Sequence, residues 1–93
     1  MSAPTKPNFF AHQIALSILR RRSVYRPGVT ADEIQRHIQW LIEEMTADGY
    51  PREVIHALLT HHADIAVREA AEHNCNTHRA AFFHDLVYLE LEQ

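Results

Sequence analysis

The sequence has few of the residue types that build disulfide-rich, turn-rich or membrane-spanning proteins. Its 93 residues include one cysteine, Cys75, so a chain cannot form an internal disulfide or a four-cysteine zinc site. Two glycines and four prolines are too few for the many turns of a β-sandwich. No apolar run approaches the roughly 20 residues that cross a bilayer, and the N-terminal charges follow the apolar stretch, the reverse of a signal peptide. We therefore expect a protein of the reducing cytoplasm, with no membrane contact.

The charge balance is also modest. Nine Lys and Arg residues against twelve Asp and Glu give a formal net charge of -3 with neutral histidine, which disfavours nucleic acid as a partner. The hydrophobic fraction of 46% and the charged fraction of 23% are typical of globular chains rather than disordered ones. This length predicts one helical domain over residues 8–93, after a flexible leader over residues 1–7 that contains Pro4 and Pro7.

Periodic apolar residues predict an all-α fold, a small bundle of four amphipathic helices joined by short turns. The helices are expected at residues 8–24, 30–47, 51–73 and 77–91. Thr30 followed by Glu33 forms a capping box, the clearest helix start in the chain. Gly49 and Asn74 follow the second and third helices, where a left-handed residue commonly ends a helix.

In the first helix, apolar residues recur at helical spacing and predict a stripe that faces the core. Its members are Phe10, Ile14, Ala15, Ile18 and Leu19. Gln13, Ser17 and Arg20 are then expected to face away from the core, and Leu16 falls outside the stripe.

Trp40 lies away from the core stripe of the second helix, in a polar setting that includes His37. Two interpretations stay open at this point. The first helix crosses there and covers the indole, or Trp40 is an exposed anchor for a partner, since tryptophan is enriched where binding energy concentrates in protein interfaces. The position of Leu16 favours the second interpretation. Trp40 and His37 are therefore candidate partner-binding residues.

The third helix carries two apolar faces, the second of which is rich in alanine and includes Val67 and Ala70. A helix with two apolar faces must be covered twice, by its neighbours or by another copy of the chain. We expect homodimerisation, with Val67 and Ala70 at the interface. The alternative is that the helix breaks near His61 and bends over the core.

Four arginines cluster at the end of the first helix: Arg20, Arg21, Arg22 and Arg26. The run suits a solvated helix C-terminus, where positive charge favours the helix dipole. Its functional interpretation is contact with an anion or with an acidic patch on a partner.

Eight histidines are the one compositional oddity of the chain. His73, Cys75 and His78 cluster around the turn into the fourth helix and offer three candidate transition-metal ligands, although their spacing matches no established zinc signature. The same residues admit a cysteine nucleophile with a histidine base. A bundle of this size rarely provides the cleft and oxyanion hole that such chemistry needs, so we expect neither enzymatic activity nor a cofactor.

Together these features predict a non-enzymatic protein that binds a partner protein as an adaptor, subunit or inhibitor, and that self-associates. One alternative is a DNA-binding regulator in which residues 30–73 form a helix-turn-helix, assisted by the arginine cluster. Arg52 lies beside Glu53 at the start of the second of these helices, which equips it poorly for base contacts. A second alternative is a metal-binding domain built on the histidines and Cys75.

Overall fold

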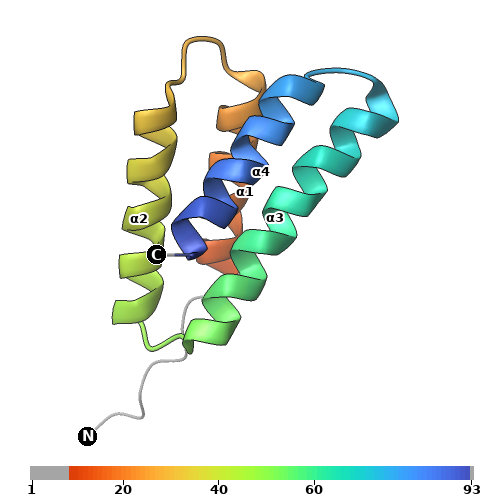
Figure 1. Cartoon of the computed structure of the whole chain (residues 1–93). Coiled ribbons are helices and arrows are strands. Elements are labelled where there is room, and N and C mark those ends of the chain that lie inside the picture. The colour runs from red at the N-terminus through yellow and green to blue at the C-terminus, as the bar shows by residue number, and fades with distance from the viewer. Residues whose placement is uncertain (1–8, 93) are drawn as a thin grey trace, which may run out of the picture.

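The computed structural model describes residues 9–92, and these residues form four helices. The helices are α1 (Phe9–Tyr25), α2 (Ala31–Ala47), α3 (Arg52–His73) and α4 (Thr77–Leu91). Successive helices run in opposite directions, as expected for short connections (Figure 1). Within residues 9–92 there is no β-strand. The predicted all-α bundle of four helices is confirmed, and each predicted end lies within one residue of the observed one. The leader expected over residues 1–7 lies outside the described residues.

The turns on either side of α2 form for the reasons that the sequence suggests. The Thr30 hydroxyl oxygen accepts a hydrogen bond from the backbone N–H of Glu33 at 3.2 Å, which satisfies one of the free amides at the helix start. At the other end Gly49 has a φ of 92°, a left-handed conformation that costs glycine little. The N–H of Tyr50 then bonds the carbonyl of Met45 at 3.0 Å, as in a Schellman motif.

Helix α3 is continuous over its 22 residues, so the predicted alternative of a break near His61 is wrong. It ends where Asn74 adopts a φ of 50°. There the N–H of Cys75 bonds the carbonyl of Ala70 at 3.0 Å, a second Schellman closure.

The core-facing side of α1 differs from the predicted one. Leu16 and Leu19 are fully buried, whereas the predicted core residues Phe10, Ile14 and Ile18 are exposed. Leu19 was expected in the core, but the assignment of Leu16 to the outside of the stripe is wrong. Because α1 carries apolar residues almost all round, its sequence pattern does not select one face.

The alanines of the alanine-rich face of α3 pack against other helices of the same chain. Ala63, Ala66 and Ala70 are all buried, and α3 packs more extensively against α4 than against any other helix. Small side chains let helix backbones approach closely, so this face accommodates the chain's own helices. Ala70, predicted to lie at a partner interface, is 1% exposed, so the chain's own helices already cover it.

Candidate interaction surface

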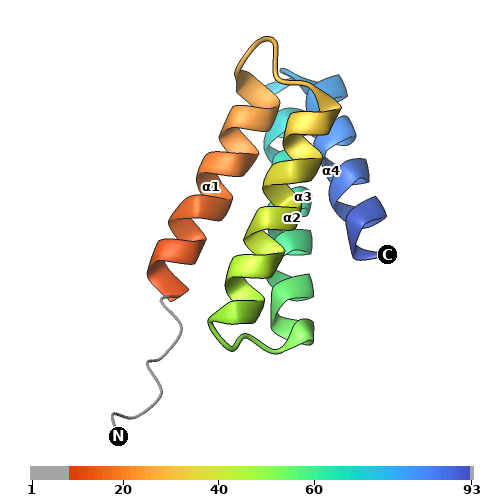
Figure 2. The same ribbon diagram turned by 90° about the vertical axis from the view of Figure 1, so that its left-hand side faces the viewer.

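Several large apolar side chains are exposed on α1 and on the adjoining side of α2. Phe10, Ile14 and Ile18 follow one another at four-residue intervals, so they lie on successive turns of α1. Their side chains are 78%, 50% and 54% exposed, and Trp40 of α2 is 51% exposed. We refer to these four residues as the α1/α2 face; the two helices that carry it lie side by side in Figure 2.

Two polar side-chain contacts between α1 and α2 show which parts of the two helices lie beside each other. At one end the guanidinium of Arg22 lies 3.6 Å from the Glu33 carboxylate, and at the other end His12 lies 3.3 Å from Asp48. Trp40 sits about midway between Glu33 and Asp48 along α2. These two contacts therefore place Trp40 beside the middle of α1.

Helical spacing places Trp40 on the side of α2 that adjoins α1. Trp40 follows Glu33 by seven residues, or about two helical turns, so both point to the same side of α2. Ile18 and Ile14 precede Arg22 by one and two turns on α1. Ile18, one turn before Arg22, is thus the member of the α1 run nearest to the side of α2 that carries Trp40, and Ile14 and Phe10 continue the run along the exposed side of α1.

His37 adjoins Trp40 and keeps this surface uncharged. The two ring centroids lie 6.0 Å apart. Burial and the nearby charge of Arg22 lower the pKa of His37 below its ordinary range, so its imidazole is neutral at neutral pH. The neutral imidazole of His37 thus adds to the uncharged surface around the Trp40 indole, where an apolar partner can pack.

A buried polar cluster between α1 and α3 explains why α1 turns its apolar stripe outward. His62 is only 4% exposed and hydrogen-bonds Gln13 at 2.9 Å and Arg20 at 3.1 Å. Gln13 and Arg20 were predicted to face away from the core, and that prediction is wrong because both are drawn toward His62. Once they occupy the side of α1 that faces α3, Ile14 and Ile18 are left on the outside.

The chemistry of these bonds fixes the protonation of His62. A guanidinium can only donate, so Nδ1 of His62 accepts from Nη1 of Arg20. The proton of the neutral ring then sits on Nε2 and is donated to Oε1 of Gln13. Burial, followed by the charges of Arg20 and His61, lowers the pKa of His62 to about 4. The imidazole of His62 is therefore neutral at physiological pH, and the guanidinium of Arg20 carries the positive charge of the cluster.

A second cluster ties the start of α1 to the turn between α2 and α3. Nδ1 of His12 and the Tyr50 hydroxyl share a hydrogen bond of 3.0 Å, and Nε2 of His12 lies 3.3 Å from Asp48. Carboxylate, imidazole and phenol would suit a proton relay. However, burial and the charge of Asp48 raise the pKa of Tyr50, so the phenol stays protonated and the three groups act as a tie.

The predicted arginine cluster is not a single patch. Arg20 has a side chain only 13% exposed and bonds His62, while Arg22 pairs with Glu33. Arg21 and Arg26 are exposed beyond the end of the apolar stripe. Consecutive residues of a helix point in different directions, so only Arg21 and Arg26 offer free positive charge at this end of the α1/α2 face.

The remaining predicted residues lie away from this surface. Val67 is exposed on α3, and His73, Cys75 and His78 are exposed around the turn between α3 and α4. Across residues 9–92, no three histidine, cysteine or acidic side chains are arranged so that they could hold a metal ion. The geometry therefore gives no support to the predicted metal-binding alternative.

The helix-turn-helix alternative finds little support in the arrangement of α2 and α3. The two helices run in nearly opposite directions (Figures 1 and 2), whereas those of a DNA-binding helix-turn-helix cross at a large angle. Arg52 and Glu53 are both exposed at the start of α3, so opposite charges stand together where base contacts would be needed.

Among the described residues, no helix is both long and apolar enough to cross a membrane. Comparison of the chain with protein-family models, with curated proteins and with solved structures finds no match.

Proposed function

We propose that this chain is a non-enzymatic protein-binding module, that the α1/α2 face is its binding surface, and that a second copy of the chain occupies it. The observation that carries the proposal is the run of Phe10, Ile14 and Ile18 on successive turns of α1 beside Trp40, each half exposed or more. A contiguous apolar surface of this kind is typical of interfaces, and tryptophan often anchors them.

The charges around the face support a second copy as the occupant. Arg21 and Arg26 lie at one end of the face, and Glu43 and Glu44 follow Trp40 toward the other end. All four side chains are exposed. A copy related by a two-fold axis, and running in the opposite direction, brings the basic end of each chain to the acidic end of the other.

The dimer interface then lies on α1 and α2 rather than on α3 as predicted, because Ala63, Ala66 and Ala70 of α3 are buried within the chain, although Val67 is exposed. A cytoplasmic location is part of the proposal, since an exposed free thiol at Cys75 suits a reducing compartment.

Sedimentation of an Ile14→Glu variant tests the proposal. At tens of micromolar the native chain should have a mass near twice 10.8 kDa, and Ile14→Glu should be a monomer. Leu89→Glu is the matched control, because Leu89 is similarly exposed but belongs to α4, away from the face. It should remain a dimer. A native chain that sediments as a monomer, or an Ile14→Glu chain that still dimerises, would contradict the proposal.

A further inference from the structure

A cavity on the other side of α2 is independent of the α1/α2 face. Helix α4 ends beside the middle of α2, so the C-terminal half of α2 and the first half of α3 extend past it (Figure 1). The cavity opens there and has a volume of about 310 Å³. Ile42, Ile55 and Leu91, one from each helix, supply apolar lining.

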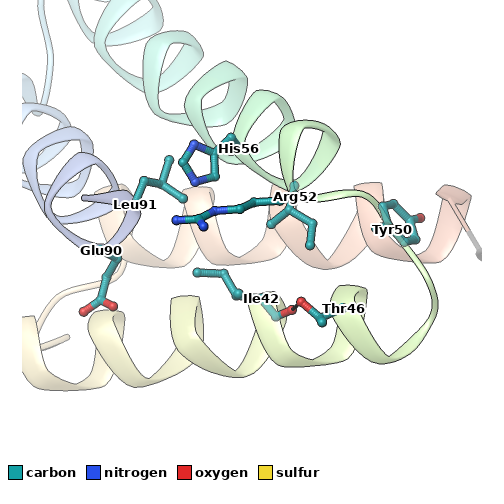
Figure 3. A pocket seen from close by; sticks show the side chains of 8 residues that line it. Ile42, Thr46, Tyr50, Arg52, His56, Glu90 and Leu91 are labelled. Carbon is teal, nitrogen blue, oxygen red and sulfur yellow. Dashed lines mark hydrogen bonds between the residues drawn. The ribbon is translucent and has the colours of Figure 1, made fainter. Parts of the chain in front are cut away.

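Two cationic or hydrogen-donating side chains line the same cavity. Figure 3 shows Arg52 extending between α2 and α3 toward the end of α4, with His56 beside it. Neither side chain has a hydrogen-bond or ion-pair partner in the described part of the chain. Arg52 is also the first residue of α3, where the positive end of the helix dipole favours an anion.

The other polar groups of the lining are already engaged. The Glu90 carboxylate accepts a hydrogen bond from the Gln39 amide at 3.2 Å, and the Thr46 hydroxyl donates to the carbonyl of Ile42 at 2.7 Å. The Tyr50 hydroxyl points away from the other lining side chains (Figure 3), and it hydrogen-bonds His12 at 3.0 Å. The hydrogen-bond donors of the lining that remain unused are therefore those of Arg52 and His56, while the second oxygen of the Glu90 carboxylate remains an acceptor.

The geometry points to a binding site for a small carboxylate with an apolar body, an alkyl or aryl acid. The carboxylate pairs with Arg52 and accepts from His56, while the apolar body lies on Ile42, Ile55 and Leu91. Because a water-sized group occupies about 30 Å³, the cavity has room for roughly ten non-hydrogen atoms. A guanidinium recognises a carboxylate through two parallel hydrogen bonds, and its attraction is stronger next to an apolar lining than in open water.

Titration of the full chain with octanoate, followed by amide NMR, tests the site. Octanoate should bind saturably with shifts centred on Ile42, Ile55 and Leu91, and at least tenfold more tightly than octan-1-ol or octylamine. Arg52→Gln should weaken octanoate binding at least tenfold and leave octanol binding unchanged. Arg68→Gln is the matched control, an exposed arginine of the same helix without a described partner, and should bind octanoate as the native chain does.

A second variant tests the cavity itself. Thr46→Phe places an aromatic ring in the cavity from an exposed position, and it should abolish the binding of both octanoate and octanol. No saturable shift up to millimolar octanoate would overturn the assignment. So would octylamine binding as tightly as octanoate, or octanoate affinity that is unchanged by Arg52→Gln.

Discussion

Arg20 and His62 lie 3.1 Å apart in a hydrogen bond that only a neutral imidazole can accept. The bond links α1 to α3, and a proton on Nδ1 of His62 would remove it while adding a second positive charge. The relationship accounts for the orientation of α1, because Arg20 and Gln13 reach His62 from the side that faces α3.

The first prediction is a loss of stability in mild acid that depends on His62. Its pKa is about 4 in the folded chain against an ordinary value of 6.5, so the unfolded chain binds more protons between these values. Stability is therefore fully present above pH 6.5 and falls as the pH drops toward 4. The expected loss is about 2 kcal/mol between pH 7 and pH 5, measured by urea denaturation.

The control for this prediction is His62→Gln, which removes the titrating group but retains a polar amide. Its stability should be lower at neutral pH and should change little between pH 7 and pH 5. If this variant loses as much stability on acidification as the native chain does, another group is responsible.

The second prediction concerns Arg79, which joins α4 to the end of α1. Its guanidinium donates to the carbonyl of Ser23 at 3.0 Å and to that of Arg26 at 2.8 Å, where the last carbonyls of α1 lack helical partners. Arg79→Met should lower the free energy of unfolding by about 2 kcal/mol, the range of hydrogen bonds from charged groups. Arg68→Met removes an exposed guanidinium without a described partner and should cost under about 0.5 kcal/mol. Equal losses in the two variants would show that these carbonyl contacts contribute nothing.

The third prediction tests the start of α2. Thr30→Ala removes the oxygen that accepts from the Glu33 amide and should cost about 1 kcal/mol in urea denaturation. Thr46→Ala serves as its comparison, because that hydroxyl only donates to a carbonyl of its own helix. A Thr30 variant as stable as the Thr46 variant would argue against the cap.

Local signals in the sequence predict the helices well. Thr30 acts through its hydroxyl on the nearby Glu33 amide, and Gly49 and Asn74 act through their own left-handed backbone, so these helix ends follow from the sequence. The orientation of α1 does not follow, because it depends on a buried bond to His62, 42 residues away from Arg20. Hydrophobic periodicity assumes that polar side chains face water, and here Arg20 and Gln13 face a buried histidine instead.

The candidate surface was predicted only in part. The exposure of Trp40 follows from the sequence, because Trp40 departs from the clear amphipathic stripe of α2. Phe10, Ile14 and Ile18 were assigned to the core because α1 has no such contrast. The cavity beside Arg52 forms because α4 ends before α2 and α3 do. Local sequence patterns do not predict it, because it depends on how the helices pack together.

The central claim is that the α1/α2 face pairs with a second, oppositely running copy, and exchange of charge between two variants tests it most directly. One variant carries Arg21→Glu and Arg26→Glu, and the other carries Glu43→Arg and Glu44→Arg. Each alone places like charges together at both ends of the dimer and should sediment as a monomer, whereas an equimolar mixture should restore a species of twice the mass. Two variants that each still dimerise, or a mixture that stays monomeric, would contradict the account.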